Sequence, residues 1–178
     1  ALPLPPEGVS FDPRTAFDRP VADIWLEIGF GAGEHLAGQA LKHRDIGFIG
    51  CEPYINGVAA LIARIESLEL DNIRIFADDA RRLLPHLPDA CLGRIFLLFA
   101  DPWPKLRHAH RRFIARPTLD ALARLLRPGG TFHAATDWQP YAEHMAEALE
   151  TCASLVSLDP DSPYARRPAY RPQTRFER

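Results

Sequence analysis

Short apolar runs alternate with longer segments of mixed polarity along most of this chain. The longer segments repeat their apolar residues at helical spacing, as at positions 58, 61, 62, 65 and 68. The pattern predicts strands at 24–28, 47–51, 73–76, 94–100 and 131–136, and helices at 34–43, 58–68, 80–87, 113–126 and 138–149. Strands and helices that alternate in this way predict an α/β fold, with a largely parallel sheet covered on both faces.

The length of 178 residues favours a single domain that spans the whole chain, 1–178. Residues 1–22 are rich in proline and predict an irregular lead-in, whereas 160–178 predict a basic C-terminal segment of low helical potential. Hydrophobic residues make up 47% of the chain, which is enough to bury a core at this size. No apolar run reaches the length of a membrane span, and no signal peptide is expected at the N-terminus.

Cys51, Cys91 and Cys152 are widely spaced and odd in number. They form no metal-ligand pattern, so we expect reduced, mostly buried thiols, no metal site and a cytoplasmic protein.

Acidic residues recur where the predicted strands end: Glu27, Glu52, Asp79 and Asp101. The carboxyl ends of parallel strands meet at one edge of a sheet, where folds of this class bind ligands. Carboxylates gathered there favour a ligand with cationic groups, such as the ammonium and sulfonium of S-adenosylmethionine.

A glycine-rich turn, with Gly29, Gly31 and Gly33, follows the first predicted strand. Glycine allows the backbone to approach a ligand closely. The spacing G-x-G-x-G differs from the G-x-G-x-x-G of dinucleotide-binding proteins. Glu34 also places a carboxylate where a pyrophosphate would bind at the helix N-terminus. The turn therefore disfavours a nicotinamide dinucleotide and favours an adenosine ligand without phosphates.

Glu52 and Asp79 suit two parts of an adenosine. Glu52, 19 residues after Gly33, can accept hydrogen bonds from both ribose hydroxyls. Asp79 can accept one from the adenine amino group. The alternatives are a surface carboxylate at position 52 and a helix cap at Asp78 or Asp79. The sequence does not separate the roles of the two adjacent aspartates.

Asp101 lies in the sequence Phe99-Ala-Asp-Pro-Trp-Pro-Lys105. Pro102 and Pro104 prevent a strand or helix from continuing, so that Asp101 is held at the end of a buried strand beside Trp103.

Positive charge is concentrated in two segments, although the net charge is −2. Residues 105–116 hold five Lys or Arg and no acid, and residues 162–178 hold five Arg and one acid, Glu177. This segregation predicts a local positive field that suits a polyanion. The alternative is two solvated basic surfaces that arise by chance.

Five motifs follow in order: Leu26-Glu-Ile-Gly-Phe-Gly-Ala-Gly33, the 99–105 sequence above, Arg107-His-Ala-His-Arg-Arg112, Ala135-Thr-Asp-Trp-Gln-Pro-Tyr141 and Arg171-Pro-Gln-Thr-Arg-Phe-Glu177. Together they resemble the bacterial tRNA (guanine-N7-)-methyltransferases, the TrmB family, over residues 26–178. The first motif is shared by many methyltransferases, whereas Asp-Pro-Trp, Thr-Asp-Trp and Thr-Arg-Phe-Glu are specific to this family.

The resemblance implies a class I methyltransferase fold with S-adenosylmethionine as donor. It implies transfer to N7 of guanine 46 in the variable loop of tRNA, with Asp101 at the transfer site. The implied donor-binding residues are Glu27, Gly29, Gly31, Gly33, Glu52, Asp79 and Asp101. The implied substrate contacts are Lys105, Asp137, Thr174, Arg175, Phe176 and Glu177, and the implied RNA contacts are Arg107, His108, His110, Arg111 and Arg112. We expect tRNA as partner, no membrane association, and a monomer or homodimer.

Guanine N7 carries an in-plane lone pair and no proton, so its methylation requires alignment and electrostatics rather than a general base. Asp137 could accept from guanine N1–H and N2–H and thereby select guanine over adenine. The alternative is that Asp137 caps a helix that begins at Trp138. Trp103 and Trp138 could stack on bases, although core packing is expected for at least one.

Two other functions fit parts of the pattern. A methyltransferase of small molecules or proteins would be active without RNA. A non-enzymatic RNA-binding module with this fold would bind RNA but not the donor.

Overall fold

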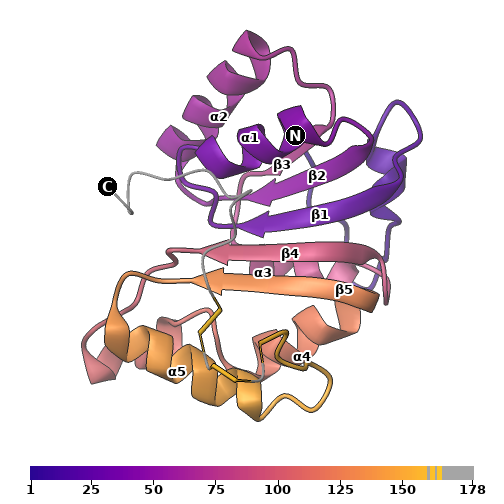
Figure 1. Cartoon of the computed structure of the whole chain (residues 1–178). Helices are drawn as coiled ribbons and strands as arrows, with labels where there is room; N and C mark the ends of the chain where they lie inside the picture. The colour runs from indigo at the N-terminus through magenta and orange to yellow at the C-terminus, as the bar shows by residue number, and fades with distance from the viewer. Residues whose placement is uncertain (160, 163, 166–178) are drawn as a thin grey trace.

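The computed structural model describes residues 1–159, 161, 162, 164 and 165 (Figure 1). In this part of the chain five strands form one sheet with the order β3-β2-β1-β4-β5, and every neighbouring pair is parallel. The strands are β1 (Asp23–Ile28), β2 (Ile46–Cys51), β3 (Ile73–Phe76), β4 (Leu92–Leu98) and β5 (Leu126–Ala135). The strand order reverses between β1 and β4, and ligands bind at such a point in open α/β sheets.

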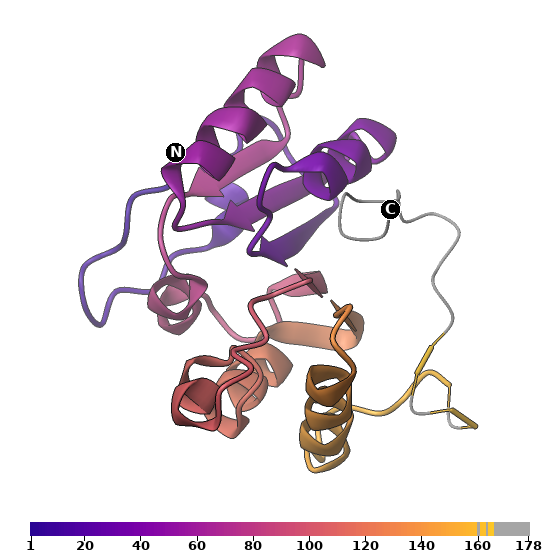
Figure 2. The same cartoon turned by 90° about the vertical axis from the view of Figure 1, so that its left-hand side faces the viewer.

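Helices cover both faces of the sheet, and Figure 2 views the molecule from the carboxyl ends of the strands. One face packs against α1 (Glu34–Lys42) and α2 (Ile55–Ser67). The other packs against α3 (Ala80–Leu83), α4 (Arg116–Leu125) and α5 (Gln139–Glu150). Three short 3₁₀ helices complete the described elements: η1 (Pro13–Ala16), η2 (Leu84–His86) and η3 (Leu106–Arg111). The expected α/β fold with a covered parallel sheet is confirmed.

Side chains alternate between the two faces of the sheet along each strand, and this alternation produces two separate hydrophobic cores. Along β1, Ile24, Leu26 and Ile28 pack with α3, α4 and α5, whereas Trp25 packs with α1 and α2. All six residues of β1 are buried, as expected for a central parallel strand.

Several boundaries differ from those that the sequence predicts. The fourth helix begins at Arg116 rather than 113, because Pro117 fits only in a first turn. Phe113 therefore lies in the preceding loop, where it is buried. The second helix begins earlier, at Ile55, and β4 ends at Leu98 rather than 100.

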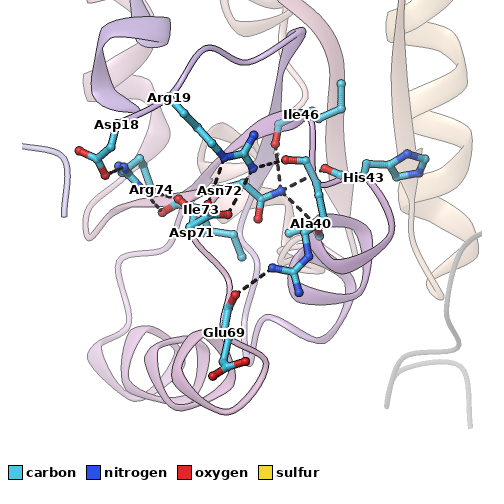
Figure 3. A network of polar contacts seen from close by, with 11 residues as sticks. Asp18, Arg19, Ala40, His43, Ile46, Glu69, Asp71, Asn72, Ile73 and Arg74 are labelled. Carbon is cyan, nitrogen blue, oxygen red and sulfur yellow. Dashed lines mark hydrogen bonds and ion pairs between the residues drawn. The ribbon is translucent and has the colours of Figure 1, made fainter.

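Asn72 holds the sheet together at the end opposite to the carboxyl ends of the strands (Figure 3). Its side chain is buried, and its amide nitrogen donates to the carbonyl groups of Ala40, His43 and Ile46 at 3.0–3.1 Å. The backbone carbonyl of Asn72 accepts from the backbone N–H of Phe48 in β2. The end of α1, the start of β2 and the start of β3 are thus joined by one residue.

Two arginines attach the N-terminal segment to this end of the sheet (Figure 3). Arg19 pairs with Asp71 at 3.0 Å, and Arg74 pairs with Asp18 at 2.9 Å and donates to the carbonyl of Ala16. The expected irregular lead-in is therefore ordered through its side-chain contacts and contains η1.

The three cysteines are free and buried, as expected. Burial raises the pKa of the Cys91 thiol to about 11 and also raises that of Cys51, so neither is a thiolate at neutral pH. Within the described residues no helix combines the length and the hydrophobicity that crossing a membrane requires. The same residues contain no cluster of potential metal ligands.

Candidate functional site

A cavity of about 1020 Å³ opens at the carboxyl ends of β1, β2 and β4, next to the start of α3. Its volume is sufficient for a nucleoside-sized ligand. Its walls contain six of the residues that the sequence analysis assigned to donor binding: Glu27, Gly29, Gly31, Glu52, Asp79 and Asp101. His110 and Arg111 of the basic segment also line it.

Glu52 organises the glycine-rich wall of this cavity. The residue is buried, and its carboxylate accepts from the backbone N–H of Gly31 at 2.8 Å and of Tyr54 at 3.0 Å. A carboxylate has about four lone-pair sites, so two remain for hydroxyl donors. The alternative reading of Glu52 as a surface residue is wrong, because only 6% of it is exposed.

The glycines of the turn are required by its geometry. Gly29, Gly31 and Gly33 all have positive φ angles, between 55° and 73°, which disfavour residues with a side chain. Gly57, in the first turn of α2, packs directly on this turn: a Cβ at position 57 would lie 2.4 Å from the carbonyl oxygen of Gly31. No local sequence signal marks Gly57, because its importance depends on a contact between two separate elements.

Glu27 forms a buried pair with His35 from the first turn of α1. The Nδ1 of His35 lies 2.6 Å from Oε2 of Glu27, and both side chains are less than 5% exposed. His35 Nδ1 therefore carries the proton that Glu27 accepts. The ring packs edge-on against Phe96, and its Nε2 has no hydrogen-bond partner within the described residues.

Asp79 is the N-cap of α3, where its Oδ1 accepts from the N–H of Arg81 at 2.9 Å. The capping role is thereby confirmed for Asp79, and the same residue lines the cavity. Asp78 instead pairs with Arg82 and is not among the residues that line the cavity. The structure thus separates two aspartates that the sequence did not.

Asp101 is exposed and lines the cavity just beyond the end of β4. The backbone on either side is strained, because Phe99 and Trp103 have φ angles of 56° and 44°. Strain of this kind persists only where surrounding contacts enforce it. Here Arg112 supplies such contacts, since it donates to the carbonyls of Pro102 at 2.9 Å and Trp103 at 3.4 Å.

The basic segment 105–112 contains both outward and inward cations. Lys105, Arg107 and Arg111 are exposed, and Arg111 lies 4.8 Å from the centre of the Trp103 ring. Arg112 differs, because it is half-buried and also lies over the rings of Trp138 and Tyr141. The structure gives Arg112 a role in holding the segment, and its contact with RNA stays a prediction.

Asp137 lies at the end of β5, outside the cavity lining. The alternative in which it caps the last helix is wrong, because α5 begins at Gln139 with Trp138 as N-cap and no side-chain cap. Among the described residues the Asp137 carboxylate makes no hydrogen bond or ion pair, and it is exposed. Trp138 packs partly against the core, so core packing is confirmed for one of the two tryptophans.

Several sequence predictions lie outside this cavity or outside the described residues. Gly33 is the N-cap of α1 and does not line the cavity, and Lys105, Arg107 and His108 lie on η3 or beside it. The predicted substrate contacts Thr174, Arg175, Phe176 and Glu177 lie outside the described residues, as does most of the basic C-terminal segment.

The first turn of α1 is poorly suited to a phosphate group. Glu34 lines the cavity there, and its carboxylate lies 3.5 Å from the Arg64 guanidinium. Together with Glu27, Glu52, Asp79 and Asp101, it makes the cavity wall predominantly acidic. This wall favours a ligand with cationic groups.

Comparison with known proteins places the chain among methyltransferases. The sequence profile of a family described as "Putative methyltransferase" matches residues 21–178. The chain is 46% identical over 178 residues to the tRNA (guanine-N(7)-)-methyltransferase of Paramagnetospirillum magneticum, and the match covers 99% of this chain and 74% of that protein. It is 45% identical over 171 residues to the enzyme of the same name from Methylococcus capsulatus, with 96% and 74% covered.

Solved methyltransferase structures share the fold. Precorrin-6y C5,15-methyltransferase from Geobacter metallireducens superimposes with a TM-score of 0.62 at 14% identity, over 78% of this chain and 66% of that chain. The 16S rRNA methyltransferase KamB superimposes with a TM-score of 0.54 at 21% identity, over 76% and 71%. At these identities the comparison establishes the Rossmann-like class I methyltransferase fold alone.

Proposed function

Because the chain belongs to the tRNA (guanine-N7-)-methyltransferase family, we propose that it transfers the methyl group of S-adenosylmethionine to N7 of guanine 46 in the variable loop of tRNA. The observation that carries this proposal is that the predicted donor site and the predicted RNA-binding surface adjoin each other. An acid-lined cavity and a basic segment share the wall that contains Asp101, His110 and Arg111.

The residues of the cavity fit S-adenosylmethionine. Glu52 is fixed by two backbone N–H groups and keeps lone pairs for the two ribose hydroxyls. Asp79 accepts from the adenine amino group. Glu27, held by His35, faces the ammonium group of the donor. The positive φ angles of Gly29 and Gly31 allow the backbone to approach the donor without a side chain between them.

When bound, S-adenosylmethionine supplies a methyl group made electrophilic by its sulfonium. Guanine N7 provides the lone pair, and no proton is removed from it, so the protein needs no general base. Asp101 holds a fixed negative charge beside the cavity and stabilises positive charge as it moves to the purine. The constrained backbone between Phe99 and Trp103 fixes the position of this carboxylate.

Guanine and RNA are held by residues outside the cavity. Asp137, exposed and without another partner among the described residues, accepts from guanine N1–H and N2–H. Lys105 and the Thr174–Glu177 segment contact the substrate nucleotide. Lys105, Arg107 and Arg111 bind phosphates, with His108 and His110 beside them, and this makes the affinity for RNA dependent on salt.

The test is incubation with labelled S-adenosylmethionine and a tRNA transcript, followed by nucleoside analysis. The expected product is 7-methylguanosine. A transcript with adenosine in place of guanine 46 is the matched control and should remain unlabelled. Label in the control would contradict the position, and label transferred equally well to protein or small molecules would contradict tRNA as the substrate.

A further inference from the structure

Arg81 joins the cavity wall to the basic segment, and the proposed function gives it no role. It is the second residue of α3 and lines the cavity. Its Nη1 donates to Oδ2 of Asp79 at 3.0 Å, on the donor side. Its Nη2 donates to the carbonyl oxygens of Arg111 at 3.0 Å and Arg112 at 3.3 Å, at the end of the basic segment. One guanidinium thus spans two regions that are about 30 residues apart in the chain.

The contact continues from the basic segment to the residues around Asp101. The Arg81 guanidinium also makes a cation–π contact, because it lies 5.0 Å from the centre of the Phe113 ring. Arg81 binds the backbone carbonyl of Arg112. The side chain of Arg112 donates in turn to the carbonyls of Pro102 and Trp103. A continuous set of hydrogen bonds therefore connects Asp79 with the segment that carries Asp101.

We propose that Arg81 couples occupancy of the donor cavity to the placement of the basic segment, so that donor and tRNA bind with positive cooperativity. This inference rests on the proposed function, because it assumes that the cavity binds the donor and the segment binds tRNA. In this account Arg81 is a positioning residue: it touches neither the donor methyl group nor the guanine.

The sign of the coupling follows from the capacity of the Asp79 carboxylate. Its two oxygens accept the N–H and the Nη1 of Arg81, which leaves lone pairs for the adenine amino group. A donor bound there restrains Asp79, which restrains Arg81 and the carbonyls of Arg111 and Arg112. The basic segment then loses less conformational entropy when RNA binds, because it is already ordered, and RNA binds more tightly.

The magnitude is limited by solvent. The side chains of Arg81 and Asp79 are 40% and 42% exposed, so water screens their ion pair. We therefore expect a coupling factor of about fivefold, at the low end of the range typical for linked sites.

The experiment measures the dissociation constant of unmodified tRNA with and without saturating S-adenosylhomocysteine, which fills the donor cavity without transfer. In the unaltered protein S-adenosylhomocysteine should tighten tRNA binding about fivefold. By reciprocity, tRNA should tighten S-adenosylhomocysteine binding by the same factor. Independent binding, or weaker tRNA binding with S-adenosylhomocysteine, would overturn the proposal while leaving the proposed function intact. Failure of either ligand to bind alone would instead refute the proposed function.

Arg81→Lys is the decisive variant. Lysine keeps the charge but its single ammonium cannot bridge a carboxylate and two carbonyls in the fixed fork of a guanidinium. We expect the coupling factor to fall to about one, while tRNA affinity without S-adenosylhomocysteine changes by less than about twofold. Arg82→Lys is the matched control, because Arg82 lies on the same short helix but pairs with Asp78, outside the cavity lining. The control should retain the coupling, and coupling that survives in Arg81→Lys would overturn the proposal.

A second measurement does not depend on RNA. Trypsin cleaves after Lys105, Arg107 and Arg111, which are exposed. S-adenosylhomocysteine should slow cleavage at these positions in the unaltered protein and in Arg82→Lys, but not in Arg81→Lys. Equal protection in Arg81→Lys would show that the cavity acts on the segment by another route and would overturn the role of Arg81.

Discussion

Gly57→Ala should weaken donor binding at least about tenfold and should also lower the free energy of unfolding. A Cβ at position 57 would lie 2.4 Å from the Gly31 carbonyl oxygen and 3.1 Å from Cγ of Glu52. Ordinary contacts between carbon and oxygen begin at about 3.3 Å, so either α2 or the glycine-rich turn must move by about 1 Å. A displacement of this size breaks the 2.8 Å bond between Gly31 N–H and Glu52.

The substitution acts on donor binding and on stability. A displaced Glu52 loses the hydrogen bonds that it would make to the donor, and one hydrogen bond to a charged group is worth about 1.5–3 kcal/mol, which corresponds to about 10–150-fold weaker donor binding. For the free energy of unfolding, overpacking costs about 1–3 kcal/mol and the lost bond between Gly31 N–H and Glu52 costs about 1.5–3 kcal/mol, whereas alanine in place of glycine in a helix returns about 1 kcal/mol. The net loss of stability is therefore about 1.5–5 kcal/mol.

Calorimetry with S-adenosylhomocysteine measures the first effect, and urea unfolding measures the second. Ala59→Gly is the control: the residue is exposed on the same helix, and its replacement costs about 1 kcal/mol of helix propensity without touching the turn. Its donor affinity should stay within about twofold. A folded Gly57→Ala protein with unchanged donor affinity would refute both the packing argument and the assignment of the turn to the donor.

Four further outcomes are expected. Asp101→Asn should lower the single-turnover methylation rate by about 10²–10³, and saturating donor should not restore it if Asp101 stabilises the moving charge. Glu52→Ala should weaken donor binding by about 1.5–3 kcal/mol in calorimetry. Arg107→Ala should reduce the slope of log affinity for tRNA against log salt by about 0.7–0.9, with donor affinity unchanged because Arg107 is exposed and lies outside the cavity lining. Because the hydrogen bond from Arg19 lowers the pKa of Asp71, their ion pair stabilises the fold above the ordinary carboxyl pKa and is lost as the pH falls through the lowered one. Arg19→Ala should therefore reduce the urea midpoint more at neutral pH than below that pKa, where only the hydrogen bond from Arg19 to the carbonyl of Arg44 is lost.

Local sequence patterns were sufficient for the order of the five described strands along the chain and for the position of the cavity, although β4 (Leu92–Leu98) and β5 (Leu126–Ala135) differ from the predicted 94–100 and 131–136. The buried run that forms β1 and the acids after the strands are signals within a few residues of each other, and parallel strands bring them to one edge. Proline explains the boundary that the apolar pattern misplaced: Pro117 sets the start of α4, whereas the apolar residue Phe113 suggested an earlier one. Phe113 is buried in the loop before α4, and its position in the sequence happens to match the apolar spacing of the helix that follows.

The parts that the sequence did not predict are contacts between distant residues. Arg112 stands among exposed cations in the sequence, and only the position of Trp138 and Tyr141 shows that it points inward. The link from Arg81 to the basic segment likewise joins residues about 30 positions apart. His35 carries no local sign that it meets Glu27, because that pairing depends on how α1 lies on β1.

The side-chain amide of Asn72 makes one end of the sheet harder to open by thermal fluctuation than the other. It joins α1, β2 and β3 at one end of the sheet, whereas loops that carry the cavity residues lie at the other. Backbone amides near Phe48 should therefore exchange with solvent only on global unfolding, and those around Asp101 should exchange through small local openings. Loops at the cavity end can loosen to admit a donor or release a product while the strand register is kept at the far end. Function and stability are thereby assigned to opposite ends of the same five strands.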